Sequence, residues 1–567
     1  MAWRDSLSTW SASRPAAIAA SFVVATAAIL WILGTDPLEF RRHLTFAQFW
    51  SLELCVASGL ATGAWILRDI ARELTRRDVM TMAGVAAFAA CLTLFVAPRT
   101  NRIYYDEQIY QGVGQNLADL RLAQMCNDGS VEYGRLQCWA GEYNKQPYGY
   151  PHLLSIAYRL VGVRGDVAFV VNLLTMVATT LMAYVAAIFL FKGDRVAAFF
   201  ASLLLAFLPQ QLLWSATAAV EPSASLACLT SVAAVAYFAH SRSTSALVAV
   251  GVSTAYAVQF RPESILILPV IAWLMWRRAP SESGQTRFWW VGVLTIGLLA
   301  VHIGHLVAVR NEGWGTTDAM LSLRYVADNF RVNGGFYVWD ERFPIVVTLL
   351  ALVGLTDHRS RDAKVALTLY FLLFFGIGLL FYAGSYNYGA DVRYSLMTYP
   401  PLVLLAGLGA STLTIRLANI NAAVRWTAVL TAALLFQFLS YLPQVRATTE
   451  EAWAARADVR FAESLVPVLR GNSYVLTHNP GMFHVWGVNA GQMSLAFNDP
   501  TRLKYLATRF TGGVYLHWNF WCNVQVPVQQ DFCRKVLAIA PARAVQSSEE
   551  RGQRLVLYRF EEFAREE

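Results

Sequence analysis

The sequence predicts an all-α polytopic membrane protein with a small C-terminal α/β domain outside the membrane. Hydrophobic residues make up 56% of the 567 residues, whereas charged residues make up only 15%. A soluble domain usually carries about a quarter charged residues, so most of this chain is expected to lie in lipid. The chain also contains a series of apolar runs of membrane-spanning length, and a polar tail, residues 443–567, follows the last of them.

The apolar runs predict about thirteen transmembrane helices. Their centres lie near Val23, Ala57, Phe88, Thr180, Leu204, Val232, Val250, Pro269, Leu299, Ala351, Phe374, Leu404 and Leu434. The first run, Ala16 to Gly34, is long enough to span and has no cleavage site after it, so a retained helix is expected instead of a signal peptide.

Three regions are expected from this pattern. Residues 1–78 form an N-terminal pair of helices, and residues 79–442 form a transmembrane core with long outer loops at 98–165 and 310–344. Residues 443–567 are long enough for a domain of their own. In that tail we expect a helix and three short strands. They are Trp453 to Leu469, Ser473 to Thr477, Gly513 to His517 and Leu555 to Phe560.

Four cysteines predict which segments face an oxidising compartment. Cys126 and Cys138 are close together in the first long loop, and Cys522 and Cys533 are close together in the tail. Short-range pairs in polar segments are typical of disulfides; the alternative is four free thiols with accidental spacing. The short loops on the other side are rich in arginine, as the positive-inside rule requires. We therefore expect a cytoplasmic N-terminus and a C-terminal domain on the periplasmic or extracellular side.

The net charge of +8 does not indicate a nucleic-acid partner, because no basic stripe with interleaved aromatic residues is present. Arginines at the ends of spans, facing lipid headgroups or phosphate, explain the charge better.

Two motifs in the first outer loop indicate a functional site. Tyr105-Asp106-Glu107 follows the apolar run Val79 to Ala97, and two adjacent carboxylates at the mouth of a membrane helix are costly unless they serve a function. The second motif is Lys145-Gln146-Pro147, with a further proline at Pro151. The alternative for the acidic pair is a cap at the start of a surface helix.

An acidic pair after an early helix, followed by Lys-x-Pro-x-x-x-Pro before the next apolar run, resembles the GT-C superfamily of glycosyltransferases. The branch of protein O-mannosyltransferases and lipid A aminoarabinose transferases is the most similar. The resemblance covers roughly Val79 to Leu417 and leaves the first two spans as an addition. It implies a glycosyltransferase of the bacterial cytoplasmic (inner) membrane. The enzyme would move a sugar from a polyprenyl-phosphate carrier to a lipid, glycan or protein acceptor at the outer face.

The resemblance also implies roles for individual residues. Asp106 would be the general base of an inverting transfer, with Glu107 in support, and Lys145 would bind the leaving phosphate. The family often has Lys-Pro-Pro, and here Gln146 intervenes, which leaves the register of Lys145 open. We expect Asp106 and Lys145 to meet across one pocket; contact with a lipid headgroup is the alternative for Lys145.

Further candidate substrate-binding residues are Tyr105, His152, Glu221, Arg261, Arg324, Arg393 and Tyr394. Arg393-Tyr394 opens a late helix, and Arg261 lies between two apolar runs, where it must face a cavity or pair with Glu263. Arg324 lies in the second outer loop and could equally be a solvated arginine. Glu221 could bind the sugar or a divalent ion, or could simply begin a helix before a proline.

No cofactor is expected, and no metal site is supported. His302 and His305 have a chelating spacing but no accompanying carboxylate in the same span, so buried histidines are expected. The rival function is a transporter or flippase, or a non-catalytic binder, of lipid-linked saccharides. Internal repeats with broken helices at the bilayer centre would indicate transport, and inspection of the sequence finds no such repeat.

Overall fold

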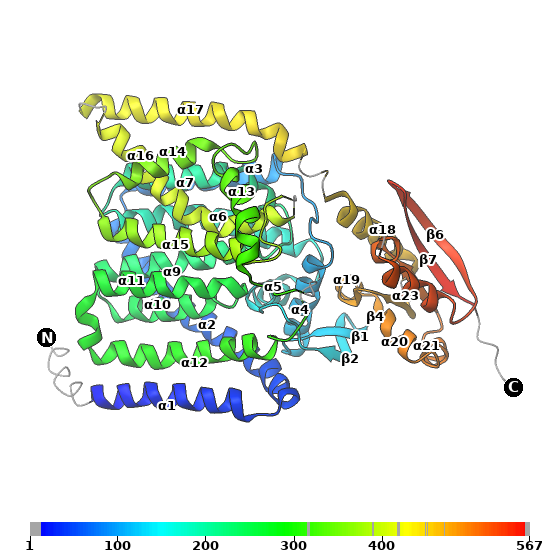
Figure 1. Cartoon of the computed structure of the whole chain (residues 1–567). Helices are drawn as coiled ribbons and strands as arrows, with labels where there is room; N and C mark the ends of the chain where they lie inside the picture. The colour runs from blue at the N-terminus through cyan, green and yellow to red at the C-terminus, as the bar shows by residue number, and fades with distance from the viewer. Residues whose placement is uncertain are drawn as a thin grey trace.

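The computed structural model describes residues 13–313, 318–387, 390–416, 420–447, 450, 452–469, 471–524 and 526–561. A bundle of long helices lies beside a smaller α/β domain, which packs against one end of the bundle (Figure 1). Helix α1 begins at the opposite end of the bundle (Figure 1). The predicted fold class, a helical membrane protein with a small C-terminal α/β domain, agrees with this architecture.

Each predicted span centre falls in a separate helix. These helices are α1 (Ser13–Gly34), α2 (Pro37–Glu73), α3 (Arg76–Phe95), α6 (Val167–Leu190), α7 (Arg195–Phe207), α9 (Glu221–Ser241), α10 (Thr244–Ala257), α11 (Ile267–Arg278), α12 (Thr286–Ala308), α14 (Ile345–Leu355), α15 (Arg361–Leu380), α16 (Tyr399–Arg416) and α17 (Ile420–Ala447). Within the described residues, nine helices are long and apolar enough to cross a membrane. A tenth results if α7 and α8 (Pro209–Ser215), bent by 62°, form one span. The number thirteen therefore remains a prediction.

The two predicted outer loops contain short elements. Residues 98–165 form α4 (Asp106–Leu120), β1 (Met125–Glu132), β2 (Arg135–Glu142) and α5 (Gly149–Val161). Residues 310–344 contain η4 (Leu323–Tyr325) and α13 (Val326–Phe336). Three further 3-10 segments join helices: η2 (Pro262–Leu266), η3 (Pro280–Gly284) and η5 (Asp391–Thr398).

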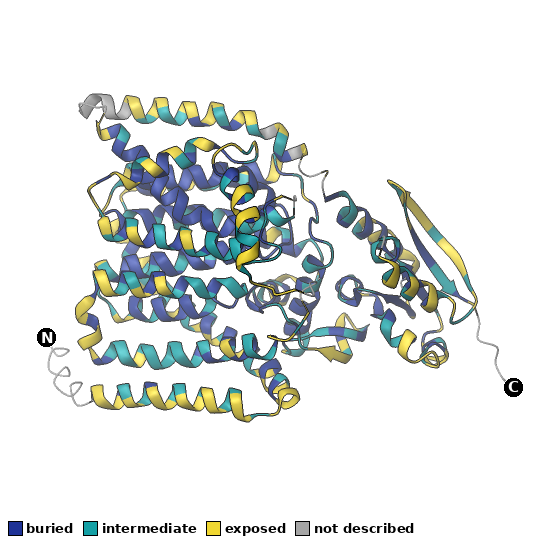
Figure 2. Ribbon diagram, in the orientation of Figure 1, coloured by how far each residue is buried: buried dark blue, intermediate teal, exposed yellow. Residues whose placement is uncertain are grey.

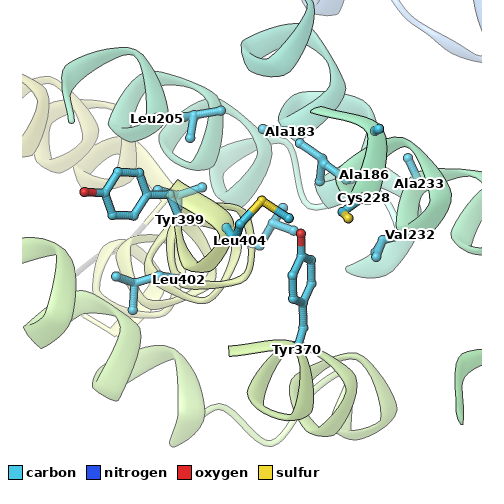
Figure 3. Packing of buried hydrophobic residues seen from close by; sticks show 14 of the residues in the cluster. Ala183, Ala186, Leu205, Cys228, Val232, Ala233, Tyr370, Tyr399, Leu402 and Leu404 are labelled. Carbon is cyan, nitrogen blue, oxygen red and sulfur yellow. The ribbon is translucent and has the colours of Figure 1, made fainter. Parts of the chain in front are cut away.

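Helix α16 forms the centre of the bundle. In the most apolar stretch of residues 391–416, which include α16, 94% of the positions are buried, whereas in that of α1 only 11% are buried. Exposed positions are concentrated on outer helices such as α1 and α17 (Figure 2). Leu404 of α16 lies among buried side chains of α6, α9 and α15, including Ala186, Cys228 and Tyr370 (Figure 3). A Cβ at Gly409 would lie 1.9 Å from Leu350 O, so α14 and α16 can approach this closely only through glycine.

The C-terminal domain is built on a seven-stranded sheet with the order β2-β1-β4-β3-β5-β7-β6. Its own elements are α18 (Trp453–Leu469), β3 (Ser473–Thr477), α19 (Pro480–Val485), β4 (Asn489–Gln492), α20 (Met493–Asn498), α21 (Arg502–Arg509), β5 (Gly513–Trp518), α22 (Phe520–Asn523), α23 (Pro527–Leu537), β6 (Ala542–Glu550) and β7 (Gln553–Phe560). The expected helix and three strands are present as α18, β3, β5 and β7. β3 runs parallel to both neighbours, β4 and β5.

Two strands of this sheet come from residues 98–165, the first predicted outer loop. β1 pairs with β4 through Asp128↔Gly491 and Gly129↔Ala490. Asp128 is buried and accepts a hydrogen bond from Tyr474, and it also forms an ion pair with Arg502. The sheet therefore ties the bundle to residues 443–567, a connection that the sequence did not predict.

Both predicted disulfides are present. Cys126–Cys138 links β1 to β2, and Cys522–Cys533 links α22 to α23; the Cα–Cα distance is 5.6 Å in each. Each bond therefore stabilises a segment that belongs to the sheet domain or packs on it.

Candidate active site

Charged side chains from four separate segments meet at the end of the bundle nearest the C-terminal domain (Figure 1). Arg393 Nη1 lies 3.6 Å from Asp106 Oδ2, and Arg393 Nε lies 3.3 Å from Glu221 Oε1. Arg261 forms ion pairs with both Glu221 and Glu263. We call Asp106, Glu221, Arg261, Glu263 and Arg393 the charge cluster.

Local sequence explains why these residues lie at helix ends. Asp106 is the first residue of α4, and Glu221 is the first residue of α9, followed by Pro222, which is well tolerated in a first turn. Carboxylates are favourable at helix N-termini, where the unpaired amides carry partial positive charge. Arg261 precedes Pro262 and is extended, because a residue before proline avoids the helical region.

Most side chains of the charge cluster are shielded from solvent, but that of Asp106 is partly exposed. The side chain of Glu221 is 1% exposed, those of Arg261 and Arg393 are 12% exposed, and that of Asp106 is 31% exposed. Buried charges are retained only when opposite charges compensate the loss of water. Asp106 is therefore the carboxylate of the charge cluster that a molecule from outside can reach most easily.

The charge cluster also has unused hydrogen-bonding capacity. In the described part of the chain, Arg393 Nε and Nη1 and Glu221 Oε2 are buried and make no hydrogen bond, although opposite charges lie nearby. Buried donors and acceptors without partners are uncommon and call for an explanation such as a bound ligand. Guanidinium donors suit a phosphate oxygen.

Aromatic rings complete the wall of the charge cluster. Two guanidinium groups lie over the ring of Tyr394, those of Arg261 and Arg393, each 5.2 Å from its centroid. Tyr110 lies one helical turn after Asp106 and packs edge-on against Tyr150 at 5.7 Å. Sequence reasoning missed Tyr110 and Tyr150; the i, i+4 spacing from Asp106 was the available signal for Tyr110.

Glu107 points away from solvent and holds the loop before α4. Its carboxylate accepts hydrogen bonds from the Asn101 side chain and from the Arg102 amide N–H, the latter at 3.1 Å. Burial raises the pKa of Glu107 to about 7. This position suits a supporting residue better than one that touches substrate.

Tyr105 connects the acidic pair to the C-terminal domain. It has a backbone φ of 70°, which is unfavourable for a residue with a side chain. Its ring stacks on Tyr104 at 4.1 Å, and Tyr104 lies 4.5 Å from Phe520 and 5.8 Å from Trp521. We call Tyr104, Tyr105, Phe520 and Trp521 the aromatic seat, because it fixes the residue directly before Asp106.

Three predicted residues have their contacts elsewhere. Lys145 Nζ donates to Gly313 O at 2.6 Å in the second outer loop. His152 is buried against α2, with Nε2 3.2 Å from Glu53 Oε1. Arg324 is exposed and pairs with Asp318 at 2.6 Å. Arg393 lies beside Asp106, and the expected meeting of Asp106 with Lys145 stays a prediction.

Metal ligation receives little support from the described residues. Among them, one group has metal-like spacing, His478 with Cys522 and Cys533, but these cysteines are joined in a disulfide and offer no thiolate. His302 and His305 stack with ring centroids 6.0 Å apart, and His305 Nδ1 is paired with a tyrosine hydroxyl. At Glu221, two guanidinium groups disfavour a divalent cation.

The fold and the charge cluster define a multi-span membrane protein with an ionic site at one end of its bundle. Residues 145–305 match the family model described as dolichyl-phosphate-mannose-protein mannosyltransferase. The segment includes Glu221 and Arg261 but neither Asp106 nor Arg393. No curated protein matches the chain in a sequence comparison.

Solved structures are similar over most of the chain. ArnT from Cupriavidus metallidurans in the apo state is 16% identical, with a TM-score of 0.51, over 85% of this chain and 97% of ArnT. The Archaeoglobus fulgidus oligosaccharyltransferase tethered to an acceptor peptide is 11% identical, with a TM-score of 0.48, over 85% and 74% of the two chains. The match to ArnT confirms the resemblance predicted from the sequence: the chain has the GT-C fold.

Proposed function

We propose that this protein is a membrane glycosyltransferase that moves a sugar from a polyprenyl-phosphate carrier to an acceptor. The observation that carries the proposal is the pairing of an accessible carboxylate, Asp106, with a largely enclosed arginine, Arg393, whose buried Nε and Nη1 make no hydrogen bond. A transfer from a sugar phosphate needs a base for the acceptor and fixed cations for the leaving group. The similar ArnT has been solved with undecaprenyl phosphate bound, which agrees with this class of donor.

In the proposed reaction, Asp106 accepts the proton of an acceptor hydroxyl or amine. The acceptor atom attacks the anomeric carbon as the bond between that carbon and the phosphate oxygen breaks. The polyprenyl phosphate leaves with the bonding electron pair, and Arg393, assisted by Arg261, stabilises its charge. A single direct displacement inverts the configuration at the anomeric carbon.

The proposed location is the outer face of a bacterial cytoplasmic membrane. The two disulfides favour an oxidising environment for the sheet domain, and the arginine-rich loops favour a cytoplasmic N-terminus. The acceptor is a lipid, glycan or protein on that face. The proposed reaction needs no metal ion held by Glu221, because Arg261 and Arg393 already compensate its charge.

The arrangement favours an enzyme over a transporter. Asp106, Glu221 and Arg393 converge at one end of the bundle, whereas a transport path would need polar groups near the bilayer centre. A transporter or flippase of lipid-linked saccharides would move the donor intact. An enzyme releases free polyprenyl phosphate, so product analysis separates these two functions.

The test is to incubate the purified protein with polyprenyl-phosphate-linked sugars and follow release of the lipid phosphate. Asp106→Asn is expected to lower the rate by about a hundred- to ten-thousand-fold, because it removes the base. Asp531→Asn, which alters an exposed carboxylate of α23, is the matched control. Undiminished turnover by Asp106→Asn would contradict the proposal, as would transport of intact donor without release of phosphate.

A further inference from the structure

A cavity lies on the opposite side of α4 from Asp106, between the bundle and the C-terminal domain. Its volume is about 650 Å³, within the range of small-molecule sites. The walls come from α4, the loop 163–166, α18 and the segment around Trp486. Residues 108, 111 and 115 of α4 line it, and these positions are roughly half a turn around the helix from Asp106.

Three glutamine side chains form one wall of this cavity. Gln108, Gln111 and Gln115 are 3%, 5% and 1% exposed. Within the described residues, neither amide atom of Gln108 has a hydrogen-bond partner, and Gln115 Oε1 has none either. Buried amide groups without partners are costly. A ligand with both donors and acceptors would satisfy them.

Trp486 offers the cavity an aromatic face. The loop 163–166 lies close to this ring at Gly165, where an added Cβ would be 3.0 Å from Trp486 Nε1. A side chain at position 165 would therefore push against the indole. Tryptophan combines an apolar face with one polar atom, so it can pack against the C–H face of a polar ring.

The charges around the cavity cancel. Arg164 forms two hydrogen bonds to Asp166, both at 3.0 Å, and Arg99 lies over the Phe169 ring at 4.2 Å. The remaining charged lining residue is Glu463. Two arginines and two acids give a formal charge of zero, and burial lowers the pKa of the nearby His484 to about 4, which keeps it neutral. A phosphate ligand would require a surplus of cations.

We infer that this cavity is a binding site for a neutral saccharide. Neighbouring sugar hydroxyls each donate and accept hydrogen bonds, as the glutamine amides do. The apolar face of a pyranose ring can pack against the indole of Trp486. A peptide that binds by strand addition needs an open sheet edge, but the sheet contributes Val131 and Gly134, at the β1–β2 turn, to the cavity wall.

Two lining side chains join the cavity to the neighbour of Asp106, and Gln111 is one of them, because its Nε2 donates to Glu107 O at 3.3 Å. Asn101 lines the cavity and donates its amide hydrogen bond to Glu107, the neighbour of Asp106. If the proposed transferase function is correct, a saccharide held here belongs to an acceptor that extends towards Asp106. Binding itself does not depend on that function.

The test measures binding of neutral methyl glycosides and maltose to the full chain in phosphatidylcholine nanodiscs, by saturation-transfer NMR and calorimetry. Sugar-based detergents must be absent, because their headgroups would compete. Trp486→Ala and the double variant Gln108→Leu, Gln111→Leu are expected to weaken binding by about three- to ten-fold per lost contact. Trp339→Ala, an exposed tryptophan 74% accessible in the second outer loop, is the control and should bind normally.

The variant Asp106→Asn should also bind normally, although its transfer activity is lost. Failure of the transferase proposal and failure of this inference are therefore distinguishable. The inference is overturned if no neutral saccharide binds the wild type, or if both cavity variants bind as well as wild type. Preferential binding of a phosphorylated sugar or of a peptide overturns it too, as does loss of binding in Asp106→Asn. If Trp486→Ala does not fold, the glutamine variant alone decides.

Discussion

The charge cluster of the bundle, which includes Asp106, and the neighbouring Asp458 and His517 of the C-terminal domain keep polar groups buried in opposite ways. In the bundle, Glu221 is buried as part of a chain of opposite charges. In the domain, Asp458 is 1% exposed, and burial raises its pKa to about 7. Burial also lowers the pKa of the nearby His517 to about 3.

A buried ionisable group keeps its charge when opposite charges are paired with it, whereas a buried group without such a partner loses its charge. A site that must stabilise a phosphate needs permanent charge, and the charge cluster supplies it. A domain that must hold a loop in place is served better by neutral groups and aromatic packing, as in the aromatic seat. We therefore expect variants of the two regions to differ in which property they change.

The largest expected difference is between the two candidate phosphate ligands. Arg393→Gln should reduce turnover by about a hundred- to thousand-fold, a loss typical of removing a donor from a developing anion. Lys145→Gln should have a much smaller effect, because Lys145 contacts the second outer loop at Gly313. Steady-state release of lipid phosphate measures both. A larger loss for Lys145→Gln would restore the assignment made from the sequence.

The next effect concerns the aromatic seat. Trp521→Ala should lower kcat by about ten- to a hundred-fold with little change in KM for the donor, because a small displacement of Asp106 weakens catalysis more than binding. Trp521→Phe keeps an aromatic ring and should recover most of the rate. If KM rises while kcat is unchanged, the aromatic seat contributes to binding and not to the position of Asp106.

A smaller effect is expected on stability as a function of pH. The pKa of Asp458 is near 3.8 as a free group and about 7 in the folded protein. Between these values the folded state keeps a proton on Asp458 that the unfolded state has released, so the contribution of Asp458 to the free energy of unfolding falls as pH rises from about 4 to about 7. Above that range the contribution is constant and unfavourable.

Asp458→Asn keeps the oxygen that accepts from the Phe520 amide N–H but removes this titration. The variant should lose that part of the pH dependence, measured by thermal unfolding of the purified protein across the range. Asp531→Asn, in an exposed pair with Lys535, should behave as wild type. An unchanged slope in Asp458→Asn would show that this carboxyl is charged in the fold.

The smallest expected effect is that of Arg324→Ala. Its guanidinium is 49% exposed and pairs with Asp318 in the second outer loop. An exposed pair of this kind contributes little, so turnover should change by less than about two-fold. A loss of turnover as large as that of Arg393→Gln would show that this loop contributes to the active site.

Much of the site could be predicted because each of its residues stands out locally. Asp106, Glu221, Arg261 and Arg393 are charged residues beside apolar runs, where a charge is costly without a purpose. The partner of each charge could not be predicted in the same way. Lys145 and Arg393 both fit a phosphate ligand locally, and only the packing of the helices brings Arg393 to Asp106.

The sequence by itself determined the helical membrane class, the two disulfides and the positions of the helices in the chain, because apolar runs and nearby cysteines act over short distances. The packing of the folded chain brings β1 and β2 into the sheet of the C-terminal domain, sets Tyr104 and Tyr105 against Phe520 and Trp521, and places Trp486 and the glutamines of α4 around one cavity. These contacts join residues hundreds of positions apart. Their free energy depends on how whole elements pack, which no local pattern in the chain records.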